Sequence, residues 1–210
     1  MGPTATIRQF LGPAGPLEAL FEHPEEPPRA VVVFGHPHPL HGGTMHTKVV
    51  YRAAKTFLEL GCAILRFNFR GVGKSDGSYD EGRGEMQDFR AAVDWATTQY
   101  PGISVWAAGF SFGAWVALSA GTSDDRVAML MGIAPPTHYD LTEFQHSEKP
   151  KFLIHGEADE LIPLQGIWKL YGKLQEPKEL VVIDAADHLF DGKVSEVGDA
   201  IEDLLGDFEL

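Results

Sequence analysis

The sequence is short of several features that mark particular classes of protein. A single cysteine, Cys62, occurs among its 210 residues, so no internal disulfide can form and nothing indicates an oxidising compartment. No apolar run is long enough for a membrane-spanning helix, and no charged-then-apolar leader opens the chain. We therefore expect a cytoplasmic protein with no membrane partner.

Positive charge is also scarce. The chain has 17 lysine and arginine residues against 30 aspartate and glutamate residues, which gives a formal net charge of −13. Such a balance repels the phosphates of nucleic acids and of anionic membranes. We expect a small molecule as the partner rather than a nucleic acid.

The pattern of apolar residues predicts one α/β domain spanning residues 1–210. Residues 4–10 and 16–22 alternate like the strands of an antiparallel hairpin. Apolar strands and amphipathic helices then alternate, which favours a parallel sheet with crossover helices on both faces. The expected strands are 30–34, 63–67, 104–109, 127–133, 151–155 and 180–184, and the expected helices are 45–60, 84–100, 112–121, 164–174 and 193–205. The prediction is a mostly parallel, eight-stranded sheet.

Residues 135–150, between two of these strands, are too few for a large cap domain. They leave room for one short helix near residues 139–146. We therefore expect a site open to solvent.

The segment Gly109-Phe110-Ser111-Phe112-Gly113 has the G-x-S-x-G pattern, with an apolar strand before it and a helix after it. This pattern is typical of a nucleophile elbow, a sharp turn that presents one serine hydroxyl above a sheet. Glycine at both flanking positions removes side chains that would crowd the strand and the helix. The pattern predicts Ser111 as a catalytic nucleophile.

An activated serine needs a base and a group that orients the base. Asp159 follows the expected strand 151–155, and His188 follows the expected strand 180–184, so both belong at the edge of the sheet where the elbow lies. We predict His188 as the base and Asp159 as the acid. The alternatives for the acid are Glu157 or Glu160, with Asp184 or Asp187 as local partners of the histidine; His155 is expected to be structural.

The backbone amides that would bind an oxyanion are expected in two places. One is the amide of Phe112, at the start of the helix after the elbow. The other lies in the loop of residues 35–44, where Pro37 and Pro39 have no N–H to donate. The candidates there are His38, Leu40 or a later residue. The candidate apolar walls of the substrate pocket are Phe110, Phe112, Leu40, Pro135, Leu189 and Phe190.

Taken in order, these motifs resemble the alpha/beta-hydrolase superfamily, in particular its small, lid-poor, dienelactone-hydrolase-like branch of serine hydrolases. The segments that carry the resemblance are HPHPLHGGTM (36–45), RFNFRGVGKS (66–75), GFSFG (109–113) and the surroundings of Asp159 and His188. The resemblance implies a triad of Ser111, Asp159 and His188 and an oxyanion amide from the first loop. We expect no cofactor. Dienelactone hydrolases carry a cysteine nucleophile, whereas this elbow holds serine, and that departure favours esterase-like acyl transfer.

The expected activity is hydrolysis of short-chain carboxylic esters through an acyl-enzyme on Ser111, by a monomer or a homodimer. A thioesterase or a lactonase would use the same residues. Two alternative hypotheses assign the chain to other functional classes. One is a metallohydrolase whose metal ion is bound by His36, His38, His41 and His46. The other is a binding protein that has kept the fold without activity.

Overall fold

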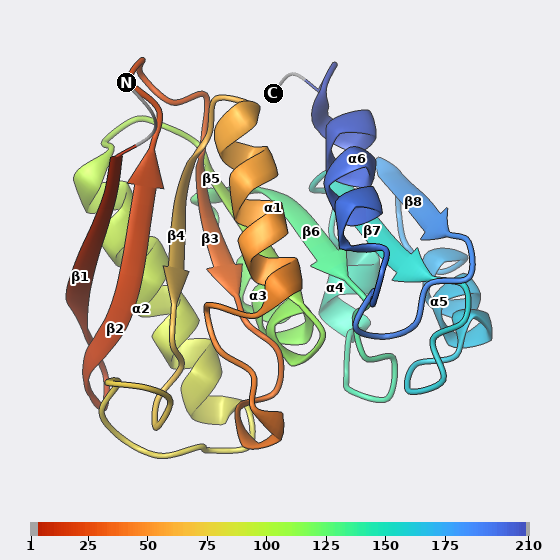
Figure 1. Ribbon diagram of the computed structural model, residues 1–210, viewed down its shortest axis with the longest axis horizontal. Helices are drawn as coiled ribbons and strands as arrows, with labels where there is room; N and C mark the ends of the chain where they lie inside the picture. Colours follow the sequence, from red (N-terminus) through yellow and green to blue (C-terminus); the bar gives the residue numbers. More distant parts are fainter. Residues whose placement is uncertain (1–3, 209–210) are drawn as a thin grey trace.

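The computed structural model describes residues 4–208, and an eight-stranded sheet forms its centre (Figure 1). The strand order is β1-β2-β4-β3-β5-β6-β7-β8. β1 and β2 form an antiparallel hairpin that pairs antiparallel with β4, and all other neighbours are parallel. The strands are β1 (Thr4–Gly12), β2 (Gly15–His23), β3 (Val31–Gly35), β4 (Ala63–Phe67), β5 (Val105–Phe110), β6 (Val127–Ile133), β7 (Lys151–Gly156) and β8 (Lys178–Ile183).

Helices cover both faces of the sheet, as the sequence predicts (Figure 1). One face packs against α1 (Lys48–Glu59) and α6 (Val194–Leu205). The other packs against α2 (Arg83–Gln99), α3 (Phe112–Thr122), α4 (Thr142–His146) and α5 (Leu164–Tyr171). Within β3, Val31 and Val33 face the second layer while Val32 and Phe34 face the first, so the strand is apolar throughout.

The connectivity fixes where a site can form. From β3 the chain crosses to β4 on one side and later returns to β5 on the other side of β3. Loops that leave adjacent parallel strands in opposite directions leave a crevice at the carboxyl ends of those strands. The loop after β3 and the turn after β5 meet at this crevice.

Most boundaries lie within three residues of the expected ones. The helix expected over residues 45–60 is α1, which begins at Lys48 because the preceding residues form a turn. In that turn, the Thr47 amide donates to the Thr44 carbonyl at 3.1 Å, and the Thr44 amide donates to the Thr47 hydroxyl at 3.2 Å. The short helix expected near residues 139–146 is α4, and no larger insertion interrupts the sheet between β6 and β7.

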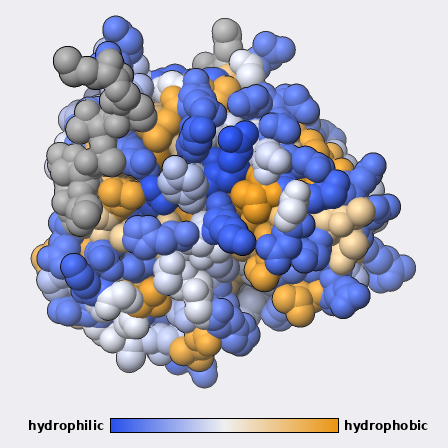
Figure 2. Space-filling view, in the orientation of Figure 1, coloured by the Kyte–Doolittle hydropathy of each residue, from blue (hydrophilic) through white to orange (hydrophobic). Residues whose placement is uncertain are grey.

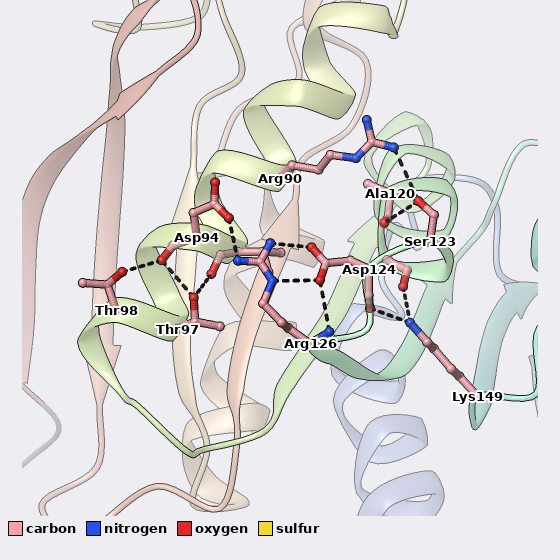
Figure 3. A network of polar contacts seen from close by, with 11 residues as sticks. Arg90, Asp94, Thr97, Thr98, Ala120, Ser123, Asp124, Arg126 and Lys149 are labelled. Carbon is pink, nitrogen blue, oxygen red and sulfur yellow. Dashed lines mark hydrogen bonds and ion pairs between the residues drawn. The ribbon is translucent and has the colours of Figure 1, made fainter.

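At the opposite edge of the sheet, ahead of β6, a polar network joins three elements (Figure 3). The Arg126 guanidinium contacts Asp94 of α2 and Asp124, each at 2.6 Å. The Lys149 ammonium donates to the carbonyl of Gly121, in the last turn of α3, and to that of Asp124, in the loop that follows. Because both side chains of the Arg126–Asp94 pair are exposed, that pair contributes little to stability, whereas Asp124 is half-buried in the loop that leads into β6.

The face presented by α1 and α6 is mainly hydrophilic, with apolar residues scattered over it (Figure 2). Along residues 4–208, none of the helices combines the length and the apolar character needed to cross a bilayer.

Candidate active site

Ser111 occupies the turn between β5 and α3 with a strained backbone. Its φ is 54° and its ψ is −122°, a region that residues with a side chain rarely adopt. A Cβ at Gly109 would lie 2.3 Å from the Gly113 carbonyl oxygen, and one at Gly113 would lie 2.3 Å from the Gly35 carbonyl. The two glycines thus provide the close backbone approach that the G-x-S-x-G pattern predicts.

A continuous chain of hydrogen bonds joins the three predicted side chains. The Ser111 Oγ lies 2.9 Å from His188 Nε2, and His188 Nδ1 lies 2.7 Å from Asp159 Oδ2. They come from the turn after β5 and the loops after β7 and β8, three segments distant in sequence. Both distances suit direct proton transfer and ring orientation.

Asp159 is held on its other side by the backbone. Its Oδ1 accepts from the amides of Leu161 at 2.9 Å and Ile162 at 2.8 Å. Burial raises the pKa of this carboxyl, but the hydrogen bonds from His188 and Ile162 outweigh burial, and the pKa lies below its usual value. The group is therefore a carboxylate at neutral pH, as an acid that stabilises an imidazolium must be.

The alternative acids lie elsewhere. Asp184 and Asp187 are exposed, and Asp187 Oδ1 accepts from the Asp191 amide. Glu157 accepts from the Ala185 amide, and Glu160 is exposed. None of the four makes a hydrogen bond or an ion pair with His188 in residues 4–208, where the carboxylate that contacts the ring is that of Asp159.

His155 is buried in β7, as expected of a structural residue. Its Nε2 donates to the Ile162 carbonyl at 2.8 Å, which ties down the loop that holds Asp159. Burial lowers the pKa of His155, so the ring is neutral.

The candidate oxyanion amides differ in their surroundings. The Ser111 carbonyl accepts from Ala114 and Trp115, so the amide of Phe112 precedes the first bonded turn of α3. In the loop after β3, the Leu40 amide donates to His38 Nδ1 at 3.2 Å, and the His38 ring thereby caps a short 3₁₀ turn over Pro39–His41. No hydrogen bond in the described part of the chain uses the His38 amide. The Leu40 amide is thus occupied, while the amides of His38 and Phe112 remain available.

A cavity of about 690 Å³ opens beside Ser111 and His188. Of the six predicted walls, Phe112 and Leu189 line it. Phe110 and Phe190 are instead fully buried between the sheet and the α1–α6 layer, because β5 turns Phe110 to that face. Leu40 lies in the 3₁₀ turn with its side chain 67% exposed, and neither it nor Pro135 is among the lining residues. The cavity is also lined by residues that the sequence did not predict, among them Pro37, His41, Pro136, His138, Tyr139, Leu161 and Ile162.

The histidines after β3 do not converge on a common point suited to a metal ion. Both ring nitrogens of His36 face the backbone, at Pro37 and at Phe69. His38 accepts from the Leu40 amide and contacts the Tyr79 hydroxyl at 3.2 Å. Over residues 4–208, no three His, Cys, Asp or Glu side chains are grouped to hold an ion.

The mostly parallel eight-stranded sheet, the helices on both of its faces and the serine elbow at the end of β5 define an alpha/beta hydrolase. Residues 26–145 match the model of the serine aminopeptidase S33 family, and the chain belongs to this family of alpha/beta hydrolases. An uncharacterised protein of Rickettsia prowazekii is 35% identical over 206 residues, which cover 93% of this chain and 87% of that protein.

Two solved structures share both sequence and fold with the chain. One is an alpha-beta serine hydrolase homologue from Coxiella burnetii, with a TM-score of 0.90 and 36% identity over 95% of this chain and 97% of that one. The other is a serine hydrolase without a lid from Xanthomonas campestris, with a TM-score of 0.90 and 34% identity over 98% and 95%. The predicted fold, with no large cap, is confirmed, and the chain is a hydrolase of this type.

Proposed function

We propose that the protein is a carboxylesterase that hydrolyses short-chain carboxylic esters through an acyl-enzyme on Ser111. The observation that carries the proposal is the chain of contacts from the Ser111 hydroxyl through His188 to Asp159, at 2.9 and 2.7 Å. Such a chain raises the nucleophilicity of a hydroxyl that is otherwise unreactive at neutral pH.

Acylation begins when Ser111 Oγ attacks the ester carbonyl carbon while its proton moves to His188 Nε2. The carbonyl oxygen gains the negative charge, and the amides of Phe112 and His38 donate to it. His188 then gives its proton to the leaving alkoxide, so an alcohol departs and an acyl-serine remains. Asp159 holds the His188 ring throughout and stabilises its charged form.

Deacylation repeats these steps with water. A water molecule attacks the acyl carbon as His188 Nε2 takes its proton, and the oxyanion again binds the two amides. Collapse of this intermediate returns the proton to Ser111 Oγ and releases the carboxylic acid. No cofactor takes part in the proposed cycle.

The cavity supports an uncharged substrate. Its lining combines apolar side chains such as Phe112, Leu161 and Leu189 with histidines, and it includes no lysine, arginine, aspartate or glutamate. A charged ester would lose hydration there without gaining a partner. Thioesters and lactones present the same carbonyl, so substrate comparison separates these classes from simple esters.

The test is hydrolysis of p-nitrophenyl esters of increasing acyl length, alongside matched thioesters and lactones. We expect turnover of the short esters, loss of that turnover in Ser111→Ala, and labelling of Ser111 by a fluorophosphonate probe. Ser123→Ala, at the exposed end of α3, is the control and keeps wild-type turnover. Wild-type turnover by a folded Ser111→Ala protein would refute the nucleophile, and a preference for thioesters would replace the ester assignment.

A further inference from the structure

The Pro37–His38 peptide is held from one side by an imidazole that the mechanism above does not use. His36 follows β3, is fully buried, and its Nδ1 lies 2.6 Å from the Pro37 carbonyl oxygen. Its Nε2 lies 3.0 Å from the Phe69 amide nitrogen in the loop after β4. The ring therefore bridges the candidate oxyanion loop and the neighbouring strand end.

The backbone fixes which nitrogen carries the proton. The Phe69 amide can only donate, so His36 Nε2 must accept. A neutral imidazole then has its hydrogen on Nδ1, which donates it to the Pro37 carbonyl. Burial lowers the pKa of His36 to about 4, so the ring keeps this neutral form over the pH range in which hydrolases work.

A second contact leaves little space around the same carbonyl. A Cβ at Gly43 would lie 2.0 Å from the Pro37 oxygen. Gly43 does not have a positive φ, so close packing rather than backbone conformation excludes a side chain there. The Pro37 carbonyl is thus hydrogen-bonded to His36 and packed against the backbone of Gly43.

The orientation of the carbonyl determines that of the next amide. The Pro37–His38 bond is trans, and in a planar trans peptide the C=O and the N–H point in opposite directions. Because the carbonyl faces the His36 ring, the His38 N–H faces away from it. Pro37, His38 and Ser111 all line the cavity, so the peptide that carries this amide borders the same space as the nucleophile.

We infer that His36 is a positioning residue that fixes the Pro37–His38 peptide plane and thereby aims the His38 amide at the oxyanion. The inference rests on the proposed function and adds to it the residue that keeps the second donor in place. If the peptide rotated, the Pro37 oxygen would turn toward the developing negative charge and repel it. An oxyanion donor typically contributes about 10²–10³ in rate.

Two substitutions of His36 by residues with an amide side chain separate its hydrogen bond to the Pro37 carbonyl from its hydrogen bond with the Phe69 amide. In His36→Asn, the side-chain nitrogen lies near the position of Nδ1 and can donate to Pro37, while the Phe69 amide loses its acceptor. In His36→Gln, the side-chain oxygen lies near the position of Nε2 and can accept from Phe69, while the Pro37 carbonyl loses its donor. Each variant therefore keeps one of the two hydrogen bonds.

We expect kcat of His36→Asn within about tenfold of wild type and kcat of His36→Gln lower by about 10²–10³, with KM little changed in both. Asparagine is the smaller residue and leaves a larger void, so His36→Asn should have the lower melting temperature of the two. Activity and stability would then rank the variants in opposite orders, which a merely structural role cannot produce. Gly43→Ala, which pushes on the Pro37 oxygen, should also lower kcat at constant KM.

The outcomes are distinct from those that test the esterase assignment. Equal losses of kcat in the two His36 variants, or losses that follow melting temperature, would overturn the positioning role. If His36→Asn does not fold, wild-type kcat in Gly43→Ala or in His36→Gln overturns it instead. Activity retained by Ser111→Ala would overturn the proposed function, whereas inactive Ser111→Ala with unaffected His36 variants would overturn this inference alone.

Discussion

Replacing Asp159 by asparagine should abolish nearly all activity while the fold survives. The two oxygens of Asp159 have different partners: the amides of Leu161 and Ile162 donate to Oδ1, and His188 Nδ1 donates to Oδ2. Asparagine has one oxygen, and the two backbone donors hold it at the Oδ1 position. Its NH₂ group must then face His188 and donate to Nδ1.

This hydrogen bond produces the wrong tautomer. When Nδ1 of His188 accepts, the ring proton lies on Nε2, which faces the Ser111 hydroxyl and can no longer take its proton. Flipping the amide would place its NH₂ group against two N–H donors, of which that of Ile162 is buried and alone costs about 1–3 kcal/mol, so the competent orientation is rare. We expect kcat to fall by about 10⁴, equivalent to about 5 kcal/mol of transition-state stabilisation.

The assay is steady-state hydrolysis of a short p-nitrophenyl ester, with thermal unfolding as a check on the fold. Asp184→Asn and Asp187→Asn are matched controls, because both carboxylates are exposed and close to His188 in sequence. Both controls should stay within about twofold of wild type. The reasoning is refuted if Asp159→Asn keeps more than a tenth of wild-type kcat, or if either control is the damaging substitution.

Two further predictions concern stability. Burial lowers the pKa of His36 from 6.5 to about 4. Between these two pH values the unfolded chain binds a proton on this ring and the folded chain does not. The free energy of unfolding should therefore fall by about 3 kcal/mol as the pH is lowered from 6.5 to 4. Urea titrations at pH 7 and pH 4 measure the fall, and an equal fall in His36→Gln would contradict the assignment. Ser111→Gly should be about 1 kcal/mol more stable than Ser111→Ala, since glycine relieves the strain at φ 54° and alanine does not. Equal melting temperatures for the two variants would show that the turn stores no such strain.

The fold was largely predictable because its signals are local. The strands from β3 to β7 are covered on both faces, so each reads as a short apolar run, and the helices between them show an apolar face. The predicted limits of a helix or strand are wrong where hydrogen bonds of side chains determine where that element begins or ends. The apolar spacing around residues 45–48, for example, carries no sign of the Thr44–Thr47 hydrogen bonds that delay α1.

The site was predictable in part, for a related reason. Ser111, Asp159 and His188 each follow a strand, and the edge of a parallel sheet brings such positions together. Which backbone amide of the loop after β3 is free to bind an oxyanion depends on the orientation of a neighbouring side chain, the His38 ring. The capping of Leu40 by the His38 ring and the contact of His36 with Pro37 are both invisible in the order of residues. Tyr139 and Leu161 line the cavity from loops. The spacing of apolar residues in the sequence does not predict the path of a loop.

The layout of the cavity divides its lining into two groups with different freedom to change. Phe112, Leu189 and Ile162 are within three residues of Ser111, His188 and Asp159, so a substitution that reshapes the cavity there also disturbs the proton-transfer geometry. The segment that carries His138 and Tyr139 borders the same space and holds none of those three side chains. Altered selectivity, by natural drift or by directed evolution, should therefore accumulate first on that segment.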